Sequence, residues 1–186
     1  MSERYKVYND QIPHFITFTV VGWVDVFSRE LYKDILCKSL IFCMQKKGLK
    51  LHAWVFMTNH VHLIVSTSEG KKIGNFIRDM KKHTANEIIK AITKNNQESR
   101  RAWMLNMFEY TGRNNNNNEQ YQFWQQDYHP ICLDSHEKTR ERLHYLHNNP
   151  VKSGIVWLPE DYKHSSATDY YTNRKGLLPL IKLDFS

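Results

Sequence analysis

The segment from Asn59 to Val65, with the sequence Asn-His-Val-His-Leu-Ile-Val, constrains the fold more than any other feature of the chain. Successive side chains of a β-strand point to opposite faces of the sheet. The segment therefore predicts a strand that places Val61 and Leu63 in a core and both His60 and His62 on the other face. Two residues of a strand span about 7 Å, so both imidazoles can reach one divalent metal ion. A pair of core or surface histidines without metal is the alternative.

Hydrophobic periodicity around this strand predicts an α+β fold. Residues 15–21 and 51–57 are typical of strands, and a tight turn joins the second of these to the histidine strand as a hairpin. Apolar residues recur at helical spacing over 31–46 and 73–92. A last strand is expected at 128–133, followed by a helix that starts at a Ser135 cap. The order predicts a ferredoxin-like βαββαβ sandwich with an antiparallel sheet, plus a C-terminal helix.

Other parts of the chain have a weaker pattern. Periodicity is lost between residues 95 and 122, where Trp103, Met104 and Phe108 are expected to anchor at most a short element. Asn114–Asn118 is predicted to be a surface loop. Pro150 is expected to end the last helix, because the residue before a proline disfavours the α conformation. The length of 186 residues indicates one domain over 1–186, with a core of about 13–157 and a tail of 158–186.

The charge balance favours a polyanionic partner. The chain has 26 lysines and arginines against 19 acidic residues, which gives a formal charge of +7. Solvated helix faces are the alternative explanation for these cations. The candidate contacts to a nucleic-acid backbone are Lys81, Lys82, Arg140, Arg142 and Lys152.

The cysteines and the hydropathy give expectations about the compartment. Cys37, Cys43 and Cys132 are odd in number and have no Cys-x-x-Cys spacing, so neither a disulfide framework nor a zinc ribbon is indicated. No stretch of eighteen apolar residues occurs, and the start has no apolar signal region. We therefore expect a soluble, cytoplasmic protein without a membrane partner.

Tyr145 and Asn149 complete the candidate site. They are four residues apart on the predicted last helix, so a phenol and an amide oxygen face the same way. Packed across the open sheet face, this helix would bring them to His60 and His62. Two imidazoles and an amide oxygen suit Mg²⁺ or Mn²⁺ better than structural zinc. The set predicts metal-assisted attack of Tyr145 on a nucleic-acid phosphate. Alone, Tyr145 could fill the core, and Asn149 could simply precede the helix stop.

These residues resemble a known family. His60-Val61-His62 resembles the HUH motif, histidine, bulky hydrophobe, histidine, of single-tyrosine HUH endonucleases. The wider pattern is similar to the REP-associated tyrosine transposases of the IS200-like family, and the resemblance covers about residues 15–171. The segments that carry it are Trp54–His62, Phe123–His129, Tyr145–Val156 and Tyr162–Ala167.

The resemblance implies a DNA transposase and endonuclease. Such a catalytic domain binds single-stranded DNA hairpins formed by palindromic repeats, and cleaves and rejoins them through a 5′-phosphotyrosine with a divalent metal, Mg²⁺ or Mn²⁺. Carried onto this chain, Tyr145 is the nucleophile, His60 and His62 are metal ligands and Asn149 is the third ligand. In the related insertion-sequence branch a glutamine takes that last place. The resemblance leaves a monomer and a homodimer both open.

Two other functional classes remain at the level of the sequence. One is a non-catalytic RRM-like protein that binds single-stranded nucleic acid, although the strands lack the aromatic-rich pattern of such domains. The other is a metal-dependent phosphoesterase in which the two histidines activate water and Tyr145 takes no part. A covalent protein–DNA intermediate separates both from the transposase.

Overall fold

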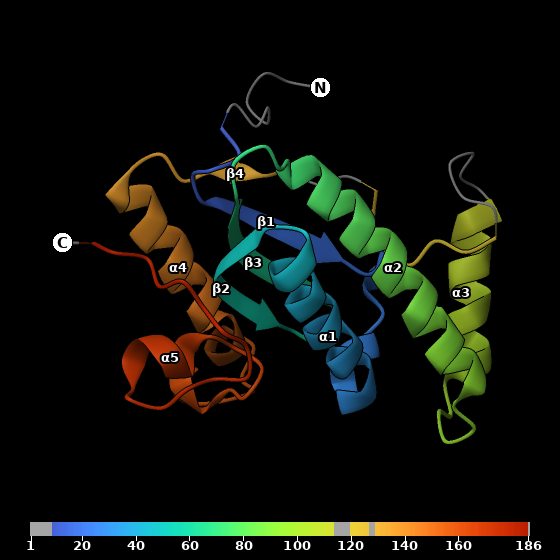
Figure 1. Cartoon of the computed structure of the whole chain (residues 1–186). Helices are drawn as coiled ribbons and strands as arrows, with labels where there is room; N and C mark the ends of the chain where they lie inside the picture. The colour runs from blue at the N-terminus through green and yellow to red at the C-terminus, as the bar shows by residue number, and fades with distance from the viewer. Residues whose placement is uncertain (1–8, 114–119, 127–128, 186) are drawn as a thin grey trace.

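Four antiparallel strands form the centre of the molecule (Figure 1). A computed structural model describes residues 9–113, 120–126 and 129–185. The strands are β1 (His14–Thr19), β2 (Leu49–Phe56), β3 (His60–Thr67) and β4 (Ile131–Cys132), in the order β2-β3-β1-β4. The helices are α1 (Glu30–Lys46), α2 (Ile73–Lys94), α3 (Arg101–Arg113), α4 (His136–Lys152) and α5 (Ala167–Tyr171). The predicted α+β fold with an antiparallel sheet and a C-terminal helix is confirmed.

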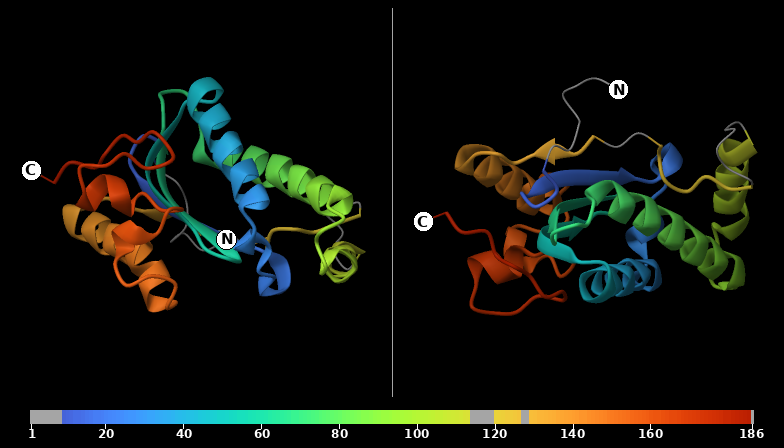
Figure 2. Two further views of the ribbon diagram at one scale, coloured as in Figure 1. Left: turned by 90° about the horizontal axis from the view of Figure 1, so that it is seen from below. Right: turned by 45° about the horizontal axis from the view of Figure 1, so that its top comes forward.

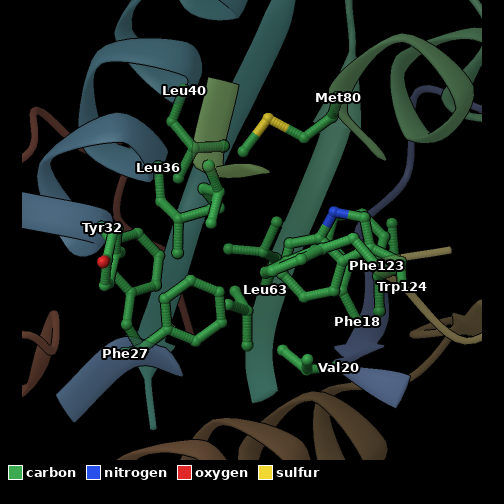
Figure 3. Packing of buried hydrophobic residues seen from close by; sticks show 14 of the residues in the cluster. Phe18, Val20, Phe27, Tyr32, Leu36, Leu40, Leu63, Met80, Phe123 and Trp124 are labelled. Carbon is green, nitrogen blue, oxygen red and sulfur yellow. The ribbon is translucent and has the colours of Figure 1, made fainter. Parts of the chain in front are cut away.

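Helices α1 and α2 cover one face of the sheet, and the main core lies between them and the strands (Figure 2). Val61, Leu63 and Val65 of β3 point into this core, as the alternation predicts. Figure 3 shows Leu63 among aromatic rings that include Phe18 and Trp124. The apolar half of β3 therefore fixes which way its histidines face.

Helix α4 covers the opposite face of the sheet (Figure 2, left). Leu143 and Leu146 of α4 pack with Phe15 of β1 and Ile64 of β3 in a second, smaller hydrophobic cluster. Residue Ile64 is two positions after His62 and so shares its face. The helix with Tyr145 is thus held against the histidine face by its own apolar stripe.

The end of α4 differs from the prediction. The helix does not stop before Pro150 but continues through it to Lys152, and Pro150 is buried. The stop lies at Gly154, whose φ is 69°. There the Gly154 N–H donates to Val151 O and the Ile155 N–H donates to Pro150 O, each at 2.9 Å, which is a Schellman motif. Asn149 is therefore an interior helical residue rather than the residue at which the helix ends.

Three other boundaries also differ. The region that lacks a clear pattern contains the 13-residue helix α3, in which Met104 and Phe108 are fully buried while Trp103 is exposed. Strand β4 has only two residues, and β1 ends at Thr19, before a 3-10 turn.

The predicted Ser135 cap is present, because its hydroxyl accepts from the Lys138 N–H at 3.3 Å. The Asn114–Asn118 segment and Tyr128 lie outside the described residues.

The segment after α4 returns to the sheet and lies along the outer edge of β2. The Phe56 N–H donates to His164 O, the Ser166 N–H to Trp54 O and the Ile181 N–H to Leu51 O, each at 2.9 Å. Leu178 of this segment is buried in the main core. None of the helices in the described part of the chain has the length and apolar character needed to cross a membrane.

Candidate active site

His60 and His62 lie next to each other on the face of the sheet that α4 covers. Their ring centroids are 4.7 Å apart, with an angle of 70° between the planes. The register places His62 opposite Thr17 and His60 opposite Thr19 of β1. The strand therefore brings the two predicted imidazoles together, as the two-residue spacing requires.

Neighbouring side chains fix the orientation of both rings. Asn59 Oδ1 is 2.7 Å from His60 Nδ1, and an amide oxygen can only accept, so Nδ1 carries the proton and Nε2 keeps its lone pair. Thr17 Oγ1 is 2.8 Å from His62 Nδ1. The Nε2 atom of His62 is buried and has no hydrogen-bond partner within the described residues. Polar neighbours that hold Nδ1 and so orient Nε2 are typical of histidines that bind metal.

Both rings favour the neutral form that metal binding requires. Burial, followed by the nearby His60 and Arg142, lowers the pKa of His62 to about 3. Burial also lowers the pKa of His60, and a hydrogen bond with the Asn149 side chain opposes this in part. At neutral pH the pair therefore offers two imidazole lone pairs rather than two positive charges.

Helix α4 brings Tyr145 and Asn149 to this pair. The Tyr145 ring lies edge-on to His62, with 5.4 Å between centroids, and edge-on to Phe15 at 5.9 Å. Its side chain is 36% exposed, so the phenol is open to a substrate rather than buried in the core. The Asn149 Nδ2 atom donates to Tyr145 O at 3.1 Å, which leaves Oδ1 for the contact with His60.

The donor set fits a divalent cation. The Asn149 side chain lies within interaction range of the His60 ring, and His62 Nε2 is buried with no hydrogen-bond partner in the described ranges. A cation among the three would satisfy all of them. No group of three histidine, cysteine or acidic side chains that could hold a metal occurs in the described ranges. An ion at this place would accordingly depend on the Asn149 amide as its third ligand.

The predicted nucleic-acid contacts separate into two groups. Lys152 Nζ lies 5.5 Å and Arg142 Cζ lies 6.0 Å from the Tyr145 ring centroid, so both cations flank the phenol. Arg140 is on the same helix but donates to Phe185 O at 3.2 Å. Lys81 donates to Gln125 O on the face of the sheet that α1 and α2 cover, and Lys82 lines a hollow between these two helices. These two lysines therefore lie on the face of the sheet that α1 and α2 cover, opposite the histidine face.

Sequence reasoning missed the residue that docks α4. His147 is fully buried, with Nε2 at 2.8 Å from Ser166 Oγ and Nδ1 at 3.2 Å from the Tyr171 hydroxyl. The Ser166 hydroxyl also accepts from the Trp54 N–H of β2 at 3.0 Å. Because His147 is two residues after Tyr145, this link sets the height of the phenol above the sheet. A signal was present, since His147 follows the apolar stripe of Leu143 and Leu146.

The buried histidines predict that the metal-free protein loses stability in acid. Burial lowers the pKa of His147 to about 3, as it does for His62. Below pH 6.5 these histidines bind protons in the unfolded chain but stay neutral in the native state. The stability that they contribute above pH 6.5 is therefore lost as the pH falls toward 3. Each residue contributes about 1 kcal/mol per pH unit. Urea unfolding from pH 7.5 to 5.5 measures this slope. Averaged over this range, His147→Gln should reduce the slope by roughly half a proton, and an unchanged slope contradicts the prediction.

Comparison with known proteins identifies the family. The model of the IS200-like transposase family matches residues 11–111, which is more than half of the chain. The protein therefore belongs to the IS200-like transposases. The matched stretch includes His60 and His62 but ends before Tyr145, so the role of Tyr145 depends on the geometry of α4.

Two solved structures are similar to this chain, and the first of them has the same fold. The structure of a REP-associated tyrosine transposase bound to a REP hairpin is similar over 100% of this chain and 96% of that chain, with a TM-score of 0.65 and 19% identity. A Deinococcus radiodurans crystal structure assigned to a transposase is similar over 80% of this chain and 96% of that chain, with a TM-score of 0.45 and 19% identity. No curated protein matches the sequence.

Proposed function

We propose that this protein is a single-tyrosine DNA transposase of the REP-associated type, which cleaves and rejoins hairpin-forming single-stranded DNA through a 5′-phosphotyrosine. The observation that carries the proposal is the convergence of Tyr145 with His60, His62 and Asn149 on one sheet face. Membership of the IS200-like family supports the transposase chemistry. The REP hairpin bound by a protein of the same fold supports hairpin DNA as the substrate class.

In this proposal His60, His62 and Asn149 hold Mg²⁺ or Mn²⁺. The bound ion would neutralise a non-bridging phosphate oxygen and stabilise charge in the transition state. Asn59 and Thr17 hold the imidazoles in the orientation that leaves Nε2 free. The docking of α4 through His147 keeps the phenol beside the ligands, so little reorganisation is needed when DNA binds.

Tyr145 supplies the nucleophile. Its hydroxyl oxygen forms a bond to the scissile phosphorus and releases its proton to solvent, while the bond from phosphorus to the 3′-oxygen breaks. That oxygen takes up a proton and leaves as a free 3′-hydroxyl. Because the phosphodiester bond energy is kept in the phosphotyrosine, another 3′-hydroxyl can reverse the step without a nucleotide triphosphate. Arg142 and Lys152 bind the DNA backbone beside the phenol.

The test is formation of a covalent adduct. Wild-type protein is incubated with Mn²⁺ and hairpin oligonucleotides that have randomised single-stranded flanks. A label at the 3′ end should become SDS-resistant and bound to protein, and a label at the 5′ end should appear in a free fragment with a 3′-hydroxyl. Peptide mapping should place the adduct on Tyr145, and EDTA should prevent it.

Other outcomes of this experiment contradict the proposal. If both labels appear in free products, the protein is a hydrolase in which the histidines activate water. If the DNA binds equally with and without Mn²⁺ and stays intact, the protein is a binding module.

A further inference from the structure

Trp23 lies close to the candidate site and has both a strained backbone conformation and a large apolar side chain exposed to solvent. It is the one non-glycine residue with a positive φ, 56°, within the described part of the chain, and it directly follows Gly22 with a φ of 61°. Bulky residues rarely adopt this conformation. The Trp23 side chain is nevertheless 60% exposed, so core packing does not explain it. Strained residues of this kind concentrate at ligand-binding sites.

The site itself holds Trp23 in this conformation. The Asn59 Nδ2 atom donates to Trp23 O at 3.3 Å, while Oδ1 of the same amide accepts from His60. The Trp23 N–H donates to Val20 O at 3.1 Å. One amide therefore orients both a candidate metal ligand and the tryptophan backbone. The Trp23 and His60 rings form a T-shaped pair, with 6.1 Å between centroids and 74° between the planes, and much of the Trp23 side chain stays open to a ligand.

Trp23 and Tyr145 lie at opposite ends of the histidine pair. Tyr145 contacts Phe15 and His62, whereas Trp23 contacts His60. In the register of β1 with β3, the pair of Phe15 and Ile64 is followed by the pairs of His62 and then of His60. The order along the sheet is thus the phenol, the two imidazoles and then the indole.

If the proposed function holds, this order determines on which side of the site the leaving nucleotide lies. In an in-line displacement at phosphorus, the leaving oxygen departs from the side opposite the attacking atom. With the phenol at one end of the histidine pair, the nucleotide that leaves with the 3′-hydroxyl lies toward the other end, where Trp23 is. We propose that Trp23 stacks on the base of this nucleotide, the one directly 5′ of the scissile phosphate.

Stacking on Trp23 would serve both halves of the reaction. During cleavage it positions the leaving 3′-oxygen in line with the phenol. After cleavage it retains the 3′-hydroxyl end, which is the group that must attack the phosphotyrosine when the strand is rejoined. An indole face accepts any base, so this contact adds affinity at one position without reading its identity.

The test pairs Trp23→Ala with abasic substrates. With wild-type protein, removing the base directly 5′ of the mapped cleavage position should slow adduct formation by roughly 5- to 150-fold, the range for loss of one stacked base. In Trp23→Ala the same abasic change should have an effect of less than about 2-fold. Trp23→Phe should keep most of the wild-type sensitivity. As the matched control, Trp157→Ala removes a tryptophan that is 94% exposed and lies beyond the end of α4, and should leave the sensitivity to the abasic change unchanged.

A binding measurement without metal gives a second readout. Tyr145→Phe protein with 2-aminopurine at the same nucleotide should quench the probe on binding, and the added Trp23→Ala change should remove the quenching. Equal quenching with and without Trp23, or abasic and Trp23 effects that simply multiply, would overturn the inference. Absence of any adduct from wild-type protein with intact substrate would instead overturn the proposed function.

Discussion

Replacing Tyr145 by phenylalanine is expected to abolish the covalent DNA adduct, with a loss of at least roughly 10³-fold in its rate of formation. The change removes one oxygen atom and keeps the ring, so the contacts with Phe15 and His62 remain. The phenol is partly exposed, and loss of its hydroxyl leaves no buried polar partner behind. The equilibrium constant for folding and the hairpin affinity should therefore both stay within about 2-fold of wild type. Adduct formation on SDS gels and DNA binding by anisotropy measure the two quantities separately.

Tyr110→Phe is the matched control. Tyr110 is an exposed tyrosine on α3. This helix packs beside α2, on the face of the sheet opposite α4. This variant should form the adduct at the wild-type rate. Adduct formation by Tyr145→Phe at more than about a tenth of the wild-type rate would show that another group is the nucleophile.

Replacing His62 is expected to have the second largest effect. His62→Gln keeps most of the side-chain volume but removes the imidazole Nε2, which is buried and has no hydrogen-bond partner in the part of the chain that the structure describes. We expect Mn²⁺ affinity and adduct formation to fall by more than roughly 100-fold, because an open site with three protein ligands has no spare donor. Calorimetry with Mn²⁺ on the DNA-free protein measures binding, and partial recovery of the adduct at high Mn²⁺ should accompany it.

Thr17→Val and His83→Ala test whether the effect of His62 is specific. Thr17→Val removes the hydroxyl at 2.8 Å from His62 Nδ1 at nearly constant shape, and should weaken Mn²⁺ binding by about 10-fold or more. His83 is an exposed histidine on α2, and its loss should have no effect. The same Mn²⁺ affinity in wild type and His62→Gln would contradict the assignment of His62 as a ligand.

Local periodicity was sufficient to predict much of the arrangement. The two-residue period of β3 places His60 and His62 on the face opposite Val61 and Leu63, and the register of the sheet preserves that separation. The four-residue spacing of Tyr145 and Asn149 likewise survives, because both lie inside α4. These features depend on geometry that each element carries by itself.

The features that could not be predicted depend on contacts between distant segments. Pro150 signals a helix stop, but its ring is buried and the Gly154 Schellman motif ends α4 one turn later. The docking of His147 requires Ser166, which lies in the segment paired with β2. The conformation of Trp23 requires the amide of Asn59 on the next hairpin. Each of these features depends on a residue far away in the sequence, which the local sequence pattern cannot identify.

The pairing of the C-terminal segment with β2 limits how this protein can associate with itself. Exposed strand edges are ready templates for joining sheets between subunits. Here the outward amides of Phe56 and Trp54 already donate to His164 and Ser166, and Leu51 accepts from Ile181. Two copies could not merge their sheets across β2 without first peeling this segment away. Peeling it away would also release the Ser166 anchor of His147, so sheet merging at this edge would unseat the helix that presents the phenol.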